Sequence, residues 1–265
     1  MTGSESVGFD TTKPSIARVY DALLGGTDNY PADNAVVEHL AETLPEIREV
    51  AQVNRAMLGR GVRYLAGPAG ITQFLDLGAG LPTMENTHQV AQALQSGAKV
   101  AYVDIDPVAL AHGRALVENN EGTVVVAADL RTSTEVLDDP AVRQTIDFTS
   151  PVAVMLVGIL HHLHDDEDPA AIVDSYLSAV PSGSHLFITH FCDSGPEARA
   201  LEKSFLEFLG TGRFRTHEEV LDLFRGLELV EPGLVYLPEW RPADEDPGEL
   251  TITQRLMVGG IARKP

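Results

Sequence analysis

Residues 73–80 read QFLDLGAG, an apolar run that ends in an acid, a leucine and two alternate glycines. An apolar run of this length followed directly by glycine predicts a buried strand and then a tight turn. Alternate glycines let the backbone turn sharply, and a ligand can lie against the turn because no Cβ is in the way. The glycine pair alone would also suit an ordinary strand-to-helix turn, so its meaning depends on the rest of the sequence.

The chain after residue 71 alternates short apolar runs with helical stretches. The expected strands are residues 73–77, 99–104, 124–127, 151–157 and 184–189. Strands that alternate with helices predict a parallel sheet with helices on both faces. Two closing strands, 227–237 and 251–262, have a Pro-rich acidic loop and no helix between them, which predicts an antiparallel edge. We therefore expect an α/β fold with a mostly parallel seven-stranded sheet.

The part of the chain before this sheet is predicted to be helical. Apolar residues recur at helical spacing on both sides of a glycine-containing loop at residues 24–31, and a third helix is expected from about residue 46 to 64. Residues 1–13 are polar and are predicted to be a flexible terminus. We expect one domain, with an N-terminal helical cap at 14–68 and a core at 69–265.

Composition limits the classes of partner. The formal net charge is −20 and no dense run of Lys or Arg is present, so a nucleic-acid partner is not expected. No apolar run approaches the length of about 20 residues that spans a bilayer, and the first residues do not resemble a secretory signal. The single cysteine, Cys192, allows no internal disulfide and no Cys-rich zinc site. These features predict a cytoplasmic protein without a membrane partner, either a monomer or a homodimer.

Two further acids stand at the ends of the next two expected strands. Asp104 ends the strand at 99–104, and Asp129 follows the strand at 124–127. A carboxylate at the first position can accept hydrogen bonds from two ribose hydroxyls, and one at the second can accept a hydrogen bond from an adenine amino group. A single such acid is more often a helix cap or a turn residue. Together with Asp76, three acids at successive strand ends favour a nucleoside site.

The details of the glycine turn distinguish between cofactors. A dinucleotide site needs a third glycine that opens into a helix, whereas Leu81-Pro82-Thr83 follows Gly80 here. Asp76 would repel a pyrophosphate but suits a ligand that carries an ammonium group and a sulfonium. These residues favour S-adenosylmethionine, and a nicotinamide-dependent oxidoreductase is the weaker alternative.

The sequence resembles the class I Rossmann-like methyltransferases that use S-adenosylmethionine. Residues 76–80 resemble their glycine-rich first motif, Asp104 their ribose-binding acid, and Asp129-Leu130 their adenine-contacting pair. Four stretches are similar to one actinobacterial family of S-adenosyl methyltransferases, formerly a domain of unknown function: PSIARVYD at 14–21, LGGTDNY at 24–30, QFLDLGAGLPT at 73–83 and WRP at 240–242. The resemblance implies a Rossmann-like fold, an N-terminal helical lid, S-adenosylmethionine as methyl donor and S-adenosylhomocysteine as product. It names no acceptor.

The resemblance and the strand-end positions together predict the cofactor-binding residues. They are Asp76, Gly78, Gly80, Asp104, Ile105, Asp129, Leu130 and Gly158.

The histidine-rich stretch GILHHLHDD, residues 158–166, follows the fourth expected strand and should lie over the cofactor. His161 and His162 are the candidate general bases, because imidazole titrates near neutral pH. Alternatively, one histidine packs beside the cofactor and the other caps a turn. No metal is expected, because adjacent histidines rarely point the same way and the spacing matches no familiar zinc site. The stretch also lacks the Asn/Asp-Pro-Pro-Tyr pattern of enzymes that methylate amino groups of bases, which favours a small-molecule acceptor.

Five residues are candidates for the acceptor site or the lid. They are Tyr20, Asn29 and Tyr30 in the N-terminal part, His190 at the end of the fifth parallel strand, and Trp240. The glycine pair at 25–26 could act as a hinge for such a lid. Structural packing is the alternative interpretation for all five. We thus expect a methyltransferase with a small-molecule acceptor, and a non-catalytic regulatory protein that binds S-adenosylmethionine or S-adenosylhomocysteine is the alternative.

Overall fold

The computed structural model describes residues 10–83, 85–242 and 248–265. The predicted flexible terminus, residues 1–13, lies mostly outside this described part. An eight-stranded sheet forms the centre of the molecule, in the order β3-β2-β1-β4-β5-β8-β6, with β7 also paired to β8. Its strands are β1 (Gln73–Leu77), β2 (Lys99–Asp104), β3 (Thr123–Ala127), β4 (Ala153–Val157), β5 (His185–Phe191), β6 (Glu228–Leu229), β7 (Val235–Tyr236) and β8 (Met257–Arg263).

The first five strands are parallel, as the sequence predicts. β1 pairs with β2 on one side and with β4 on the other, so the strand order reverses at β1. Every residue of β1 is buried, which is expected for a parallel strand that is covered on both faces. Loops that leave the carboxyl ends of such strands diverge at the reversal and open a crevice there.

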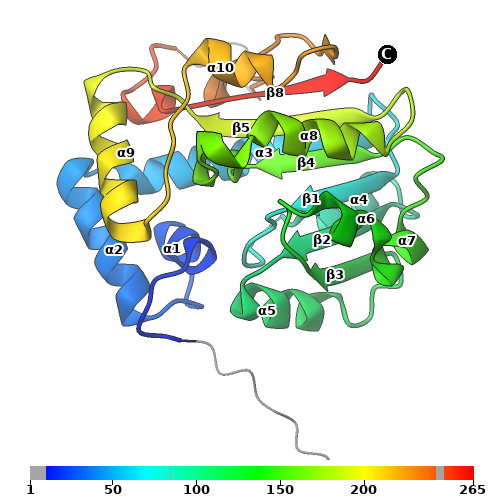
Figure 1. The fold of residues 1–265 in the computed structure, drawn as a ribbon, viewed down its shortest axis with the longest axis horizontal. Coiled ribbons are helices and arrows are strands. Elements are labelled where there is room, and N and C mark those ends of the chain that lie inside the picture. Colours follow the sequence, from blue (N-terminus) through cyan, green and yellow to red (C-terminus); the bar gives the residue numbers. More distant parts are fainter. Residues whose placement is uncertain (1–9, 84, 243–247) are drawn as a thin grey trace, which may run out of the picture.

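The two faces of the sheet are packed by different sets of helices. Neighbouring residues of one strand belong to different hydrophobic clusters: Phe74 joins the first cluster and Leu75 the second, because strand side chains alternate between faces. Figure 1 shows α3 behind the sheet and α8 in front of it. The helices are α1 (Ile16–Leu23), α2 (Pro31–Thr43), α3 (Ile47–Ala66), α4 (Thr87–Leu94), α5 (Pro107–Val117), α6 (Ser133–Asp138), α7 (Pro140–Thr145), α8 (Pro169–Ser178), α9 (Pro196–Leu209) and α10 (His217–Asp222).

The C-terminal part is antiparallel, as predicted, but its strands differ from the prediction. The prediction of seven strands is wrong: the stretch expected as one strand at 227–237 forms two strands of two residues each, β6 and β7. The break falls at Pro232-Gly233, where proline lacks an N–H for a ladder bond and Gly233 has φ +94°. The other closing strand begins only at Met257, because a short 3₁₀ helix, η4 (Thr253–Arg255), precedes it.

The helices α1, α2 and α9 gather at the end of the molecule toward which the parallel strands point (Figure 1). α1 packs on α2, and α2 packs on α9, which comes from far along the chain. This group therefore stands over the carboxyl ends of β1, β4 and β5. In the described part of the chain, no helix is long and apolar enough to cross a membrane.

Candidate functional site

A cavity of about 550 Å³ lies at the carboxyl ends of the parallel strands. Its walls come from α1, α3 and α9, from the loops after β1 to β4, and from the end of β5. All eight predicted cofactor-binding residues line it, and so do His161, His162 and Tyr20. We call one part the acidic end (Asp76, Asp104, Asp106, Asp129) and the other the histidine end (His161, His162, Phe191, Phe205, Thr211).

The glycine turn after β1 has the conformation that its sequence predicts. Gly78 and Gly80 have φ values of +71° and +67°, a region that favours glycine. A Cβ on Gly78 would lie 2.5 Å from the Ile159 side chain, so this position must also be small for the loop after β4 to approach. The amide of Gly78 donates to the carbonyl oxygen of Val103 at 2.8 Å, which ties the turn to β2.

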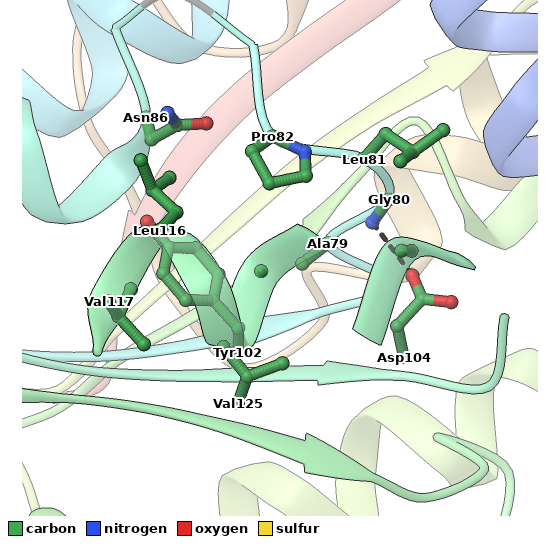
Figure 2. Close-up of a pocket in the computed structure, with 12 residues that line it drawn as sticks. Ala79, Gly80, Leu81, Pro82, Asn86, Tyr102, Asp104, Leu116, Val117 and Val125 are labelled. Atoms are coloured by element: carbon green, nitrogen blue, oxygen red, sulfur yellow. Dashed lines mark hydrogen bonds between the residues drawn. The ribbon is translucent and has the colours of Figure 1, made fainter. Parts of the chain in front are cut away.

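Asp104 organises the acidic end. Its carboxylate accepts hydrogen bonds from the amide of Gly80 at 2.7 Å and from the amide of Asp106 at 2.8 Å. Figure 2 shows the first of these bonds, with the glycine turn lying over the end of β2. Burial raises the pKa of Asp104, and both amides act in the opposite direction. A carboxylate has about four lone-pair sites, so Asp104 keeps acceptor capacity for a ligand.

A small pocket of about 30 Å³ lies beside the glycine turn, against α5 (Figure 2). Its walls include the apolar side chains of Leu116, Val117 and Val125. It has room for about one water-sized molecule. The larger cavity is therefore the candidate site.

Asp76 is the most perturbed carboxyl group of the acidic end. It is only 6% exposed and accepts a hydrogen bond from the hydroxyl of Thr87 at 2.7 Å. Burial raises its pKa to about 6, whereas the Thr87 hydrogen bond and the Arg55 guanidinium lower it. A cationic ligand group placed here would stabilise the ionised carboxylate.

Asp129 is held by an arginine that the sequence analysis missed. Arg131 binds both carboxylate oxygens of Asp129 and also donates to Glu167 at 2.8 Å. The hydrogen bonds from Arg131 lower the pKa of Asp129, so this acid stays ionised. Arg131 and Arg55 both line the cavity.

The N-terminal part is bound to the acidic end by a buried ion-pair network. Arg18, 3% exposed, donates to Asp33 at 2.9 Å and lies 3.7 Å from Asp106. The hydroxyl of Ser15 also donates to Asp106, which caps the N-terminus of α5. These contacts hold α1 against the wall of the cavity.

His161 and His162 lie on a short 3₁₀ helix, η1 (Leu160–His162), directly after β4. Nδ1 of His162 lies 2.9 Å from the hydroxyl of Thr211, and its ring stacks on Phe205 with an angle of 8°. Nδ1 of His161 is fully buried and has no hydrogen-bond partner among the described residues, and its ring meets the Phe191 ring edge-on. Burial lowers the pKa of His162 to about 4 and that of His161 well below its ordinary value. Both imidazoles are neutral at pH 7, and neither titrates near neutral pH as the sequence analysis expected, because burial disfavours the charged form.

Arg215 supports this histidine turn from behind, and sequence reasoning did not find it. The Arg215 side chain is only 4% exposed, and its guanidinium donates to the carbonyl oxygens of Leu160 and Leu163 at 3.1 and 3.0 Å. It also binds Asp165 at 2.9 Å. The hydrogen bonds to residues 160 and 163 fix the backbone on both sides of the two histidines.

His190 does not reach the cavity. Its Nδ1 lies 2.6 Å from the carbonyl oxygen of Phe191 and its Nε2 lies 3.1 Å from Arg215. The carbonyl can only accept, so Nδ1 carries the proton and Nε2 accepts from Arg215. His190 is fully buried and supports Arg215. Its position at a strand end had suggested a place in the acceptor site, which its buried ring does not reach.

Three other predicted acceptor or lid residues also lie outside the cavity wall. Asn29 donates to Asp21 at 2.8 Å and Tyr30 donates through its amide to Asp33 at 2.8 Å, so both organise the loop between α1 and α2. Trp240 is fully buried, and its ring meets that of Tyr64 of α3 edge-on at 5.8 Å. These positions favour the packing interpretation for the three residues. The Gly25-Gly26 pair belongs to the same tied loop, since a Cβ on Gly26 would lie 2.0 Å from the Asp21 carboxylate.

Tyr20 does line the cavity, as part of a polar chain that also includes an unpredicted residue, Asn54. Asn54 donates to the Tyr20 hydroxyl at 3.0 Å and accepts from the Thr189 hydroxyl at 2.7 Å. A Cβ on Gly158 would lie only 3.0 Å from Nδ2 of Asn54, so a glycine at this position leaves room for the amide. A signal was present in the sequence, because Asn54 lies at i+4 from Val50 and i−4 from Leu58 on the apolar face of α3.

The histidine-rich stretch offers no metal site in this geometry. Among residues 10–83, 85–242 and 248–265, no group of three or more His, Cys, Asp or Glu side chains is placed to hold a metal ion.

Comparison with known proteins identifies the family. Residues 2–265 match the S-adenosyl methyltransferase family. The chain belongs to this family. Its cofactor is S-adenosylmethionine, and the predictions of family, fold and cofactor are confirmed.

Two solved structures are similar over nearly the whole chain. A Thermobifida fusca protein, provisionally assigned as a methyltransferase, is 48% identical with a TM-score of 0.94, and the alignment covers 99% of each chain. A DUF574 family protein from Streptomyces avermitilis is 36% identical with a TM-score of 0.93, covering 97% of this chain and 99% of the other. A comparison with curated proteins found no match.

Proposed function

We propose that this methyltransferase acts on a small-molecule acceptor and that His162 is the general base. The observation that carries the proposal is the continuity of the cavity, which runs from the acids at the ends of β1 to β3 to the ring of His162. Its volume of about 550 Å³ lies within the range of sites that enclose small molecules. Cofactor and acceptor must share that space, which favours a small acceptor.

The acidic end fits S-adenosylmethionine group by group. Asp104 would accept hydrogen bonds from the ribose hydroxyls, and Asp129 one from the adenine amino group. Ile105, which is 63% exposed in the cavity wall, offers an apolar surface to the adenine ring. Asp76 and Arg55 would pair with the ammonium and carboxylate groups of the methionine tail. A pyrophosphate would meet four carboxylates instead, so these residues disfavour a dinucleotide.

When bound, S-adenosylmethionine supplies an electrophilic methyl carbon, which the acceptor attacks as the bond from carbon to sulfur breaks. The protein positions the acceptor and excludes water from this reaction. If the attacking atom carries a proton, Nε2 of His162 takes it as the new bond forms. Thr211 would set the tautomer: when Nδ1–H of His162 donates to the Thr211 hydroxyl, the lone pair is on Nε2.

His161 suits the base role less well than His162. Its Nδ1 is buried, and no described residue pairs with it, so a tautomer that exposes a basic Nε2 would leave an unpaired N–H in the interior. We assign His161 to the cavity wall beside the acceptor.

The test is transfer of a labelled methyl group to a panel of small acceptors by the native chain and by His162→Gln. Removal of a general base lowers the transfer rate by about 100-fold or more, whereas the affinity for S-adenosylhomocysteine stays unchanged. His164→Gln is the matched control, since His164 does not line the cavity.

Two results would argue against the proposal. An unchanged transfer rate in His162→Gln would remove the base assignment. Tight binding of S-adenosylhomocysteine without transfer to any acceptor would favour the alternative of a non-catalytic binding protein.

A further inference from the structure

The charges that line the cavity are all on one side of it. They are Asp76, Asp104, Asp106, Asp129, Arg55 and Arg131. Five of these residues lie at or just after the carboxyl ends of β1, β2 and β3. The sixth, Arg55, lies on α3 and interacts with the Asp76 carboxylate. The described residues of the cavity wall contribute no other Asp, Glu, Lys or Arg side chain.

The histidine end is apolar and aromatic. Phe205 stacks on His162 with ring centroids 6.1 Å apart, and Phe191 meets Phe205 edge-on at 5.3 Å. Leu209 at the end of α9 and Met257 at the start of β8 extend this wall. The polar groups here are the two imidazoles, the Thr211 hydroxyl and, toward α3, Tyr20 and Asn54.

A charged acceptor would lose its hydration in this end without gaining an opposite charge. Burial of an uncompensated charge is costly. The buried histidines do not compensate an anion, since burial lowers the pKa of both and keeps them neutral. Arg215 lies behind the histidine turn, and its donors are directed to backbone carbonyls, His190 and Asp165. Its charge is already paired with Asp165, so it offers no free charge to an anionic acceptor.

We propose that the methyl acceptor is an uncharged, largely apolar molecule with an aromatic ring, whose nucleophilic atom lies beside His162. Ring edges and faces at the histidine end provide the offset and edge-on contacts that aromatic ligands prefer. Thr211 and His162 supply the polar contact that orients one hydroxyl or ring nitrogen. Carboxylates, phosphate esters and free amino acids are excluded from the acceptor class. This inference rests on the proposed function, since it concerns the acceptor of the same cavity.

The experiment measures binding of three matched probes to the chain saturated with S-adenosylhomocysteine, by isothermal titration calorimetry. The probes are 2-naphthol, 6-hydroxynaphthalene-2-sulfonate and 6-aminomethyl-2-naphthol, which share one ring system and differ in charge. We expect the neutral probe to bind at least about tenfold more tightly than either charged probe.

A lysine introduced into the wall of the histidine end tests whether the probes bind there. Leu209 lines the cavity and is half-buried, and a lysine there follows the charge preference of a helix C-terminus. Leu209→Lys should tighten sulfonate binding by about tenfold relative to 2-naphthol. Leu206→Lys is the control, because Leu206 lies on the same helix, is 43% exposed and does not line the cavity.

The first titration separates the two proposals. If S-adenosylhomocysteine does not bind, the proposed function fails. If S-adenosylhomocysteine binds, the cofactor assignment stands and the acceptor class is tested separately. The proposed acceptor class is wrong if 2-naphthol does not bind or if the sulfonate binds as tightly as 2-naphthol. It is also wrong if Leu206→Lys and Leu209→Lys have the same effect on sulfonate binding.

Discussion

The acidic end and the histidine end of the cavity are built in different ways. Each acid of the acidic end lies within two residues of a strand end, and its position follows from the parallel sheet. The histidine end combines η1, β5, α9 and residue 211, and its hydrogen bond between His162 and Thr211 joins residues 49 positions apart. A site for a common cofactor can therefore lie in local turns, whereas a site for a particular acceptor depends on packing between distant segments.

The largest difference between the two ends should come from Asp104→Ala. This change removes the expected ribose contacts and the acceptor of the Gly80 amide, and hydrogen bonds to a charged group contribute about 1.5–3 kcal/mol each. We expect the affinity for S-adenosylhomocysteine to fall by about 100-fold in calorimetry. Asp138→Ala, at an exposed position, and Leu209→Lys at the histidine end should both leave it unchanged. An undiminished affinity in Asp104→Ala would show that the cofactor binds elsewhere.

Arg215→Met should damage the histidine end and spare the acidic end. The carbonyl oxygens of Leu160 and Leu163 and Nε2 of His190 would each lose a hydrogen bond from Arg215, so the free energy of unfolding should fall by about 3 kcal/mol, measured by urea denaturation. In the folded variant the methyl-transfer rate should fall while the affinity for S-adenosylhomocysteine stays unchanged.

The control for this prediction is Arg225→Met in the exposed turn after α10, which should change neither quantity. Arg215→Lys should recover part of the stability but not the full transfer rate, because lysine cannot hold both carbonyls and His190 in one plane. A full transfer rate in Arg215→Met would show that Arg215 does not position the histidines.

Thr211→Val tests the tautomer of His162. Loss of the hydroxyl releases Nδ1, and we expect the transfer rate to fall by about tenfold, the equivalent of one hydrogen bond. In the His162→Gln background the same change should have no further effect on the rate, because the two residues act through one contact. Additive losses would contradict this coupling.

The smallest expected effect is a pH dependence at the acidic end. Below its pKa of about 6, Asp76 becomes protonated and no longer attracts the ammonium group of the ligand. The affinity for S-adenosylhomocysteine should therefore weaken as pH falls, by about fourfold between pH 7 and pH 5.5. Asp76→Asn should bind more weakly at pH 7 and should lose this part of the pH dependence. An identical pH profile in the variant would assign the titration to another group.

Much of the fold followed from short-range patterns. Apolar runs predicted the five parallel strands, and β1 and β2 have the predicted bounds. The closing strands were harder to predict, because the register of β6 and β7 depends on pairing with β8 across a long connection. The predicted single strand ignored the local break at Pro232-Gly233.

In the candidate site, too, some residues could be predicted from short-range patterns and others could not. Asp76, Asp104 and Asp129 were found because parallel strands bring successive strand ends to one edge, whatever covers the sheet. His190 has the same kind of position, but its strand continues to Phe191 and buries its ring under Arg215. A strand-end pattern cannot tell which side chains remain accessible when the helices pack.

Sequence alone was sufficient to indicate the parallel sheet, the glycine turn and a phosphate-free adenosyl cofactor, since each depends on residues close together in the chain. The tertiary structure was needed for the uncharged histidine end, because the neutrality of its imidazoles results from burial by α9 and its neighbours. It was also needed for Arg215 and Asn54, whose partners lie up to 135 positions away. Burial and long-range hydrogen bonding arise only when the chain has folded, and they set the chemistry offered to the acceptor.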